Sequence, residues 1–246
     1  MARALRKHRM LVVNPIISAK FNEFDRAFFN RNASRLFQID VKSLKYGPAS
    51  IESAYDETLA SPFVVQEVVQ AEKSDFEAVI INCFMDPGIE ASKEISRIHV
   101  VGAGESSINL ALLAGDKFSI IDVGPSRYVS YSPTRLVVKH GVQSRFVSAR
   151  GVGIRVLDLD KDLERTFKAA CREGEKAARE DGADVIVLGC TGLAGLAHRI
   201  QDELKLPVID PAIAALRAAE TLILARLIPD KVAYPRPPRK SLKLPF

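Results

Sequence analysis

The stretches Ala78-Val-Ile-Ile-Asn-Cys83 and Val185-Ile-Val-Leu-Gly-Cys190 decide the fold of this chain. Each is a short aliphatic run that ends in a cysteine, and the two cysteines lie 107 residues apart. Such runs are typical of strands that are buried on both faces of a parallel sheet. A glycine-containing segment that we expect to turn helical follows each run. The pattern predicts a thiol at the carboxyl end of a buried strand, twice in one chain.

The composition is that of a globular chain with a sizeable core. Of its 246 residues, 47% are hydrophobic, which fits one large domain or two small ones. No apolar run approaches the roughly 18–20 residues of a membrane span, and the basic N-terminus lacks the apolar stretch of a signal peptide. Three cysteines do not make a disulfide framework. We therefore expect a cytoplasmic protein with free thiols and no membrane partner.

The net charge of +5 comes from the two ends of the chain. Residues 1–10 contain four Lys or Arg and no acid, and residues 230–246 contain five Lys or Arg and one acid. The body between them is slightly acidic, whereas nucleic-acid binding needs a basic face on the fold itself. We therefore expect no nucleic-acid partner. The Pro- and Lys-rich segment 230–246 predicts a tail that is mobile or docked on the surface.

Short apolar runs alternate along the chain with longer stretches of helical periodicity. This alternation predicts parallel sheets with helices on both faces. The predicted strands cover residues 10–13, 36–41, 78–82, 98–101, 118–122, 145–149, 185–189 and 207–209. The predicted helices cover residues 19–32, a region after the turn at 46–49 that reaches about residue 73, 86–97, 105–114, 125–140, 161–180, 193–203 and 211–227.

The series restarts near residue 115, with an internal repeat whose offset is 107 or 108 residues. Four segments match in order: 12–14 with 120–122, 78–83 with 185–190, 88–89 with 195–196, and 100–102 with 208–210. The repeat predicts an α/β protein of two pseudo-symmetric, Rossmann-like (flavodoxin-like) lobes, one formed by residues 1–114 with 212–246 and one by residues 115–211. Ligands of open parallel sheets bind outside the carboxyl ends of the strands, so we expect the active site in the cleft between the lobes.

Cys83 and Cys190 are the candidate catalytic residues. A free cysteine is often only a small buried hydrophobe, but these two occupy matching positions of the repeat. Cys171 serves as an internal control, because it lies within a predicted helix, has no repeat partner and is interpreted as a packing residue. The chain has no P-loop, no dinucleotide-binding turn and no His-Glu-x-x-His sequence. We therefore expect neither a metal nor a cofactor.

The predicted setting of the two thiols suits proton transfer at carbon. A free thiol has a pKa near about 8.5, and the unpaired N–H groups of a helix N-terminus lower it. We therefore expect the pKa of these thiols to fall. Two facing cysteines can remove a proton from one face of a carbon acid and return one to the other face, which inverts the carbon.

The chain resembles the aspartate/glutamate/hydantoin racemase superfamily, and within it the hydantoin (and allantoin) racemase branch. Asn82-Cys83-Phe84-Met85-Asp86-Pro87-Gly88-Ile89 is similar to that branch's Cys-Phe-Gly-Asp-Pro-Gly-Leu segment. Gly47-Pro-Ala-Ser-Ile51-Glu52 is similar to its Gly-Pro-x-Ser-Ile-Glu segment, and Leu188-Gly189-Cys190-Thr191-Gly192-Leu193-Ala194 to its second cysteine motif. The similarity extends over about residues 9–228.

The resemblance implies two α/β lobes, an interlobe active site, no cofactor, a small-molecule substrate and a homo-oligomer. It assigns proton transfer to Cys83 and Cys190, and it implies a 5-substituted hydantoin or a related cyclic ureide as substrate. It also implies a substrate cradle formed by Asn14, Ser18, Phe84, Val123, Gly124 and Thr191.

Three loops depart from the family's pattern. The first loop usually reads Asn-Pro-Asn-Thr-Ser, whereas this chain has Ile16 and Ile17 in place of the polar pair. The loop after the fifth strand usually offers paired Thr, whereas this chain reads Asp122-Val123-Gly124. Met85 stands where the branch often has Gly. These changes alter the surroundings of the substrate, so the resemblance implies the chemistry without defining the substrate.

Other functions stay open from the sequence. Maleate isomerases on this fold also use two cysteines, and arylmalonate decarboxylases use only the second one. Amino-acid racemases of the superfamily usually have His after the second Cys-Thr, where this chain has Gly192. An intracellular two-lobed sensor would not require thiols at two strand ends. A redox switch would need the two Cα atoms within about 7 Å of each other.

Overall fold

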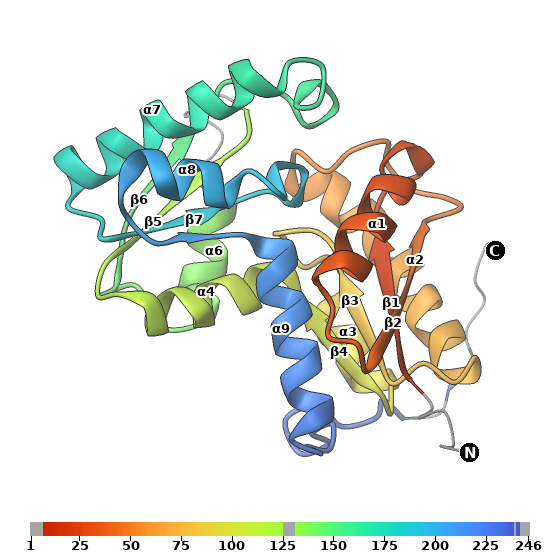
Figure 1. The fold of residues 1–246 in the computed structure, drawn as a ribbon. Helices are drawn as coiled ribbons and strands as arrows, with labels where there is room; N and C mark the ends of the chain where they lie inside the picture. Colours follow the sequence, from red (N-terminus) through yellow and green to blue (C-terminus); the bar gives the residue numbers. More distant parts are fainter. Residues whose placement is uncertain (1–6, 125–130, 239, 242–246) are drawn as a thin grey trace, which may run out of the picture.

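The computed structural model describes residues 7–124, 131–238 and 240–241, and it consists of two lobes (Figure 1). Each lobe is built on a four-stranded parallel sheet, with strand orders β2-β1-β3-β4 and β6-β5-β7-β8. The strands are β1 (His8–Asn14), β2 (Phe37–Ser43), β3 (Ala78–Ile81), β4 (His99–Gly102), β5 (Phe118–Asp122), β6 (Phe146–Gly151), β7 (Val185–Leu188) and β8 (Val208–Ile209). The predicted fold class of two lobes with parallel sheets is confirmed.

The helices fill the connections between the strands. The α-helices are α1 (Asn22–Asn32), α2 (Ala54–Lys73), α3 (Ile89–Ile95), α4 (Ala103–Ala114), α6 (Tyr131–Lys139), α7 (Leu163–Asp181), α8 (Ala197–Leu204) and α9 (Pro211–Leu224). The short 3-10 helices are η1 (Ala19–Phe21), η2 (Val156–Asp158) and η3 (Thr191–Leu193). A parallel connection needs such a crossover, because successive strands must run in the same direction.

Helices cover both faces of each sheet, because successive strand residues point to opposite faces. On β1, Met10 and Val12 belong to a core with α1 and α9, whereas Leu11 and Val13 belong to a core with α2. The second sheet has α7 and α8 on one face and α4 and α6 on the other. This burial on both faces explains the continuous aliphatic runs in the sequence.

The two sheets repeat each other in register as well as in order. Val13 is paired with Ile81 between β1 and β3, and Ile121 is paired with Leu188 between β5 and β7. The two glycines that match in the repeat are both left-handed, with φ of 72° at Gly88 and 86° at Gly195. Residues without a side chain adopt this conformation readily, so the repeated glycines are conformational requirements of the loops after the cysteines.

Helices α4 and α9 are exchanged between the lobes. Helix α4 follows β4 of the first sheet, but its Ile108 and Ala111 pack with Phe118 and Val185 of the second sheet (Figure 1). Helix α9 follows β8 of the second sheet, but its alanines pack on β1, β3 and β4 of the first. Each lobe therefore contributes a helix to the core of the other, and the division of the chain after residues 114 and 211 stays a prediction.

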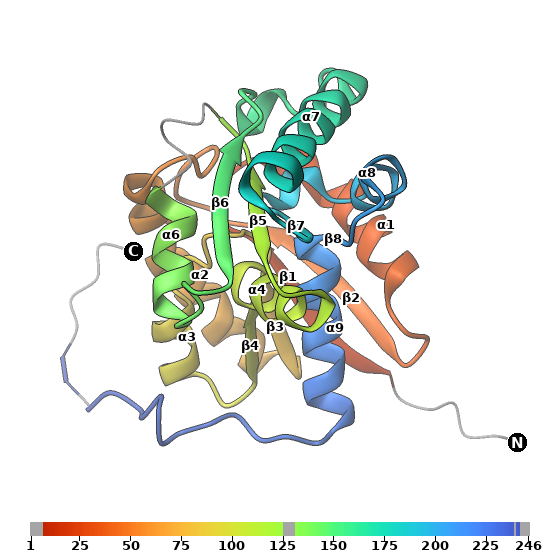
Figure 2. The same ribbon diagram turned by 90° about the vertical axis from the view of Figure 1, so that its left-hand side faces the viewer.

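Residues 227–236 run along the first lobe towards α3 (Figure 2). His99 Nε2 lies 2.9 Å from the carbonyl oxygen of Leu227, and Lys231 Nζ donates to the carbonyl oxygen of Lys93 at 2.5 Å. Arg236 donates to the carbonyl oxygen of Ile95 at 3.2 Å. The contacts of Lys231 and Arg236 satisfy carbonyl groups of the last turn of α3, which have no partner within that helix.

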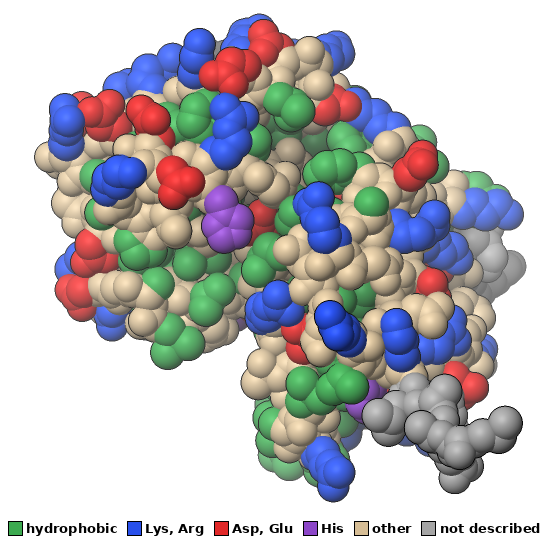
Figure 3. Space-filling model, viewed as in Figure 1, with side chains coloured by type: hydrophobic (Ala, Val, Ile, Leu, Met, Phe, Trp, Pro, Cys, Tyr) green, Lys and Arg blue, Asp and Glu red, His purple; other side chains and the backbone are tan. Residues whose placement is uncertain are grey.

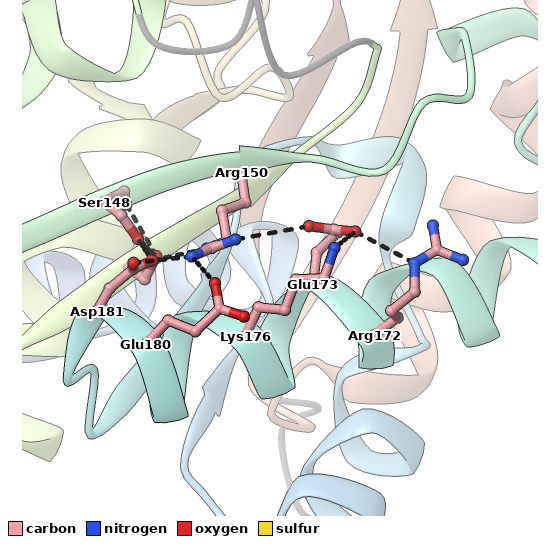
Figure 4. A network of polar contacts seen from close by, with 8 residues as sticks. Ser148, Arg150, Arg172, Glu173, Lys176, Glu180 and Asp181 are labelled. Atoms are coloured by element: carbon pink, nitrogen blue, oxygen red, sulfur yellow. Dashed lines mark hydrogen bonds and ion pairs between the residues drawn. The ribbon is translucent and has the colours of Figure 1, made fainter.

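An ion-pair network joins β6 to α7 (Figure 4). Arg150 Nε and Nη2 donate to the two oxygens of Asp181 at 2.6 and 2.8 Å, and Nη2 also donates to Glu180 at 2.8 Å. Hydrogen bonds to these carboxylates raise the pKa of Arg150, and the Arg150 guanidinium lowers the pKa of Asp181. Such a bidentate contact is stronger than a simple ion pair and orients α7 on its sheet.

Several predicted helices begin later than expected. The helix predicted from residue 86 begins at Ile89, because Asp86 and Gly88 both have positive φ, 50° and 72°. The helix predicted from residue 193 begins at Ala197, after η3 and the left-handed Gly195. Of the helix predicted over residues 125–140, the part before Tyr131 lies outside the described residues.

The surface of the described ranges carries charges of both signs. On the face shown in Figure 3, Lys and Arg side chains are spread over both lobes, and Asp and Glu side chains lie among them. No helix in the described part of the chain is long and apolar enough to cross a membrane.

Candidate active site

A cavity of about 780 Å³ lies between the lobes, at the carboxyl ends of β1, β3, β5 and β7. Cys83 follows β3, Cys190 follows β7, and both line this cavity. In a sheet of order 2-1-3-4, the crevice between strands 1 and 3 is the usual ligand site, because the connections leave there towards opposite faces. One cavity therefore joins the ligand-binding edges of both sheets, and hydrophobic side chains border the hollow between the lobes in Figure 3.

Equivalent backbone hydrogen bonds hold the two cysteine segments. Asn82 N donates to the carbonyl oxygen of Val13 at 2.9 Å, and Gly189 N donates to that of Ile121 at 2.8 Å. These bonds extend the β1–β3 and β5–β7 pairing by one residue beyond each strand. The next residue in each segment is the cysteine, so the two thiols lie at equivalent edges of the two sheets.

Cys83 is half-buried, and burial raises the pKa of its thiol well above the ordinary value. A hydrogen bond from the backbone of Met85 favours the thiolate, whereas the negative charges of Cys190 and Asp86 disfavour it. Helix α3 begins at Ile89, six residues after the thiol, so no α-helix N-terminus stabilises the anion.

Cys190 is half-buried, and burial raises the pKa of its thiol to about 12, with a further contribution from the negative charge of Asp122. Its Sγ accepts a hydrogen bond from Gly192 N at 3.3 Å within η3. The predicted fall of both thiol pKa values is wrong for the free protein. Loss of water around the sulfur outweighs one backbone N–H, because desolvation disfavours the charged form.

Cys171 lies within α7 and packs beside the core of the second lobe. Burial raises the pKa of its thiol to about 11, and it is not among the residues that line the interlobe cavity. These positions agree with its interpretation as a packing residue.

Asn82, the residue before Cys83, belongs to a buried polar network with Asn14 and Asp25. Asn14 Nδ2 donates to Asp25 Oδ2 at 2.8 Å, and Asn82 Nδ2 donates to Asn14 Oδ1 at 2.7 Å. Burial raises the pKa of Asp25 to about 6, against the opposing hydrogen bond from Asn14. The network orients the end of β1 against the end of β3, while Asn82 Oδ1 is buried without a hydrogen-bond partner among the described residues.

The structure places five of the six residues of the implied cradle around the cavity: Asn14, Phe84, Val123, Gly124 and Thr191. Thr191 Oγ1 donates to the carbonyl oxygen of Asn82 at 3.0 Å and so links the two cysteine segments across the lobes. Phe84 is only 1% exposed, because its ring packs in the core of the second lobe. It therefore anchors the Cys83 loop to the opposite lobe.

Ser18 is the cradle residue that does not line this cavity. Its Oγ accepts from Lys20 N at 3.4 Å, and its carbonyl oxygen accepts from Ser43 Oγ at 2.9 Å. Ser18 therefore shapes the first loop and η1. Of the two isoleucines in this loop, Ile16 lines the cavity and Ile17 is exposed.

Four carboxylic acids that the sequence analysis did not select line the cavity: Asp25, Glu52, Asp122 and Asp160. Glu52 lies in the Gly-Pro-x-Ser-Ile-Glu segment, and Asp122 matches Asn14 in the repeat, so signals for both were present. Asp25 is brought to the cavity by the packing of α1, for which the sequence has no local signal.

The outer part of the cavity is largely apolar. Side chains from η1 and α1, from the loop before α2 and from the second lobe form this wall: Phe21, Phe24, Phe28, Ile51, Val156, Leu163 and Leu196. Lys20 Nζ and Asp160 Oδ1, which also line the cavity, form an ion pair of 2.9 Å between the lobes. The site combines a polar floor at the strand ends with an apolar outer wall.

Comparisons with known proteins agree in one family. The family described as Asp/Glu/Hydantoin racemase matches residues 12–219. Hydantoin racemase of Pseudomonas sp. (strain NS671) is 39% identical over 186 residues, covering 76% of this chain and 74% of that protein. Hydantoin racemase of Paenarthrobacter aurescens is 34% identical over 235 residues, covering 95% of this chain and 99% of that protein.

The fold agrees with the same assignment. The structure of allantoin racemase from Klebsiella pneumoniae superposes with a TM-score of 0.91 and 28% sequence identity, covering 98% of each chain. Family, relatives and fold thus match over nearly the whole sequence, including both cysteine segments. This chain belongs to the Asp/Glu/hydantoin racemase family of isomerases.

Proposed function

We propose that this chain is a cofactor-independent racemase of a 5-substituted hydantoin or a related cyclic ureide, which works by two-base proton transfer between Cys83 and Cys190. The observation that carries this proposal is that two thiols, from matching places in a structural repeat, line one cavity. Relatives named hydantoin racemase and a similar structure named allantoin racemase support the substrate class.

The reaction moves one proton off ring carbon 5 and another onto its opposite face. One cysteine, as thiolate, removes the C5 proton, and the electron pair delocalises into the neighbouring ring carbonyl. The other cysteine, as thiol, protonates the opposite face. The first cysteine is then a thiol and the second a thiolate, so the pair is ready for the other enantiomer and no proton is consumed.

The electrostatics of the cavity support this division of roles. The negative charge of Cys190 raises the pKa of Cys83, so two thiolates together are disfavoured. Burial raises the pKa of both thiols, which makes each thiolate rarer but a stronger base towards carbon. After one of the two cysteines has lost its proton, the ionisation state of lowest free energy is one thiolate and one thiol.

The proposed substrate contacts are those cradle residues that line the cavity with polar or backbone groups. Asn14 and Thr191 offer side-chain amide and hydroxyl groups, and Val123 and Gly124 offer backbone. Gly124 has a φ of 75°, and a Cβ added to it would meet no atom of the described residues within 4 Å, which leaves room for a ring beside it. We assign Phe84 and Ser18 to holding the loops, and the apolar wall to the 5-substituent.

The test is to incubate enantiopure 5-substituted hydantoins and allantoin with the protein in D2O. Optical rotation should decay, and deuterium should appear at C5 of the product enantiomer. Dialysis against a chelator should change neither the rate at which optical rotation decays nor the rate at which deuterium enters C5. Rotation that stays constant with every cyclic ureide would refute the substrate class, and activity that a metal restores after dialysis would refute the cofactor-independent mechanism.

The proposal includes a homo-oligomer in the cytoplasm. Sedimentation equilibrium of the purified protein would measure its mass, and a mass of one chain, 27.0 kDa, at assay concentration would contradict the oligomer.

A further inference from the structure

Asp122 is the last residue of β5 and occupies the place in the second lobe that Asn14 occupies in the first. Asp122 is only 9% exposed, and like Cys190 it lines the interlobe cavity. The mechanism proposed above uses no carboxyl group, so a buried acid at this place is unexplained by proton transfer between the thiols.

Among the described residues, only one oxygen of the Asp122 carboxyl has a hydrogen-bond donor. Oδ1 accepts a hydrogen bond from Val123 N at 2.7 Å, whereas no donor among the described residues reaches Oδ2. Buried polar groups are normally hydrogen-bonded, because an unpaired acceptor loses its interaction with water. Asp122 lines the cavity, so this oxygen is available to a hydrogen-bond donor of a ligand.

The backbone around Asp122 makes room for this carboxyl. A Cβ on Gly189, the residue before Cys190, would lie 2.8 Å from the Asp122 Cβ and 2.9 Å from its Cγ. In the first lobe the matching position holds Asn82, whose amide bonds to Asn14. The first lobe therefore fills this space with an internal hydrogen bond, and the second lobe fills it with an acid that keeps one oxygen free.

We propose that Asp122 is a specificity-determining residue that accepts a hydrogen bond from a ring N–H of the substrate and disfavours carboxylate substrates. This inference rests on the proposed function, because it names the group of a cyclic ureide that the same site binds. A hydantoin ring carries two N–H donors beside its carbonyl groups, and a carboxylate oxygen is a stronger acceptor for them than a hydroxyl. A substrate carboxylate in the same place would meet a like charge.

The test measures binding without turnover. The probe is 5,5-dimethylhydantoin, which has no hydrogen at C5, and it is compared by calorimetry near pH 8 with its N1,N3-dimethyl derivative and with succinate. The wild-type protein should bind the unmethylated ring about 10- to 100-fold more tightly than the N-methylated one, which is the range for a hydrogen bond to a charged group.

The variant Asp122→Asn should lose that preference, because its amide accepts from Val123 N and turns an NH₂ group towards the ring. Its affinity for 5,5-dimethylhydantoin should fall about 10- to 100-fold, and succinate should bind it better than it binds the wild type. The matched control is Asp158→Asn, an exposed acid of the same lobe paired with Lys161, which should behave as wild type. If Asp122→Asn does not fold, Asp122→Thr replaces it.

The proposal is overturned if the Asp122 variant keeps the wild-type preference for the ring with free N–H groups, or if the wild type has no such preference or binds neither ring. Racemisation is a separate readout. A protein that binds 5,5-dimethylhydantoin through Asp122 but never racemises an enantiopure hydantoin would refute the proposed function and leave the binding role intact.

Discussion

The two lobes present the same backbone to the cavity but different polar groups. At the end of β1, Asn14 bonds to Asn82 and Asp25 in a network of neutral amides and one buried acid. At the end of β5, Asp122 lies beside Gly189, and among the described residues only one of its oxygens has a hydrogen-bond donor. The two cysteines follow equivalent strands of the two sheets. The polar groups at the neighbouring strand ends are amides in the first lobe and the carboxyl group of Asp122 in the second.

This difference separates what the repeat supplies from what individual substitutions supply. Sheet order and register bring both thiols to one edge, because equivalent strand ends meet the cavity from both sides. The side chains beside the thiols differ between the lobes, with amides in the first lobe and a carboxyl group in the second. A repeated scaffold thereby presents two chemically different faces to the cavity.

The largest expected effect comes from removing either thiol. Cys83→Ser and Cys190→Ser should each lower the rate of racemisation by about 10²- to 10⁴-fold, because a serine hydroxyl is too weakly acidic to act as base. Each variant should still exchange the C5 proton of one enantiomer in D2O, and the two variants should select opposite enantiomers. Proton exchange from both enantiomers in the same variant would break the assignment of one face to each lobe.

The pH dependence follows from the raised thiol pKa values. Only thiolate can act as base, and burial raises the pKa of Cys190 to about 12 and that of Cys83 as well. Below that pKa the thiolate fraction grows up to about tenfold per pH unit, so kcat/KM should rise steadily from about pH 6 to about pH 9. A plateau reached below about pH 7 would mean that the thiolate is already formed in the free protein.

The polar network of the first lobe should contribute to stability. Asn14→Ala removes a donor to Asp25 and the acceptor of Asn82, and it leaves both groups buried without those bonds. We expect the free energy of unfolding to fall by about 2–4 kcal/mol, measured by urea titration. A loss below about 0.5 kcal/mol would show that water replaces the amide.

The matching position of the second lobe should respond with the opposite sign. Burial raises the folded-state pKa of Asp122 to about 7, above the ordinary 3.8, so ionisation costs stability once the unfolded chain is ionised. That cost is absent below about pH 4, grows between about pH 4 and 7, and is complete above. Asp122→Asn should therefore raise the free energy of unfolding by about 1–3 kcal/mol near pH 8 and little near pH 4. A variant that is less stable near pH 8 would contradict an unpaired carboxylate.

The smallest expected effect is at the third cysteine. Cys171 packs beside the core of the second lobe, away from the interlobe cavity. Cys171→Ser should keep kcat/KM within about twofold of wild type and cost only about 1 kcal/mol of stability. An inactive Cys171 variant with an intact circular dichroism spectrum would mean that the site extends beyond the two matching thiols.

The sequence predicted more of the site's position than of its chemistry. Cys83 and Cys190 could be selected because aliphatic runs and repeat positions are local signals. Asp122 matched Asn14 in the repeat but was passed over, because a repeat compares residue types and says nothing of an unpaired oxygen. The pKa direction was wrong because it assumed helices that begin directly after the thiols.

The sequence by itself determined the alternation of strands and helices and the strand ends that carry the thiols, because each element shows its own local pattern. It also determined the duplication, because that pattern occurs twice in the same order. The tertiary structure alone decided the exchange of α4 and α9, the insertion of Phe84 into the opposite core and the approach of Asp25 to Asn14. It also decided the protonation of the buried acids and thiols. These features depend on which surfaces lose water when the two lobes pack, and no local pattern of residues records that.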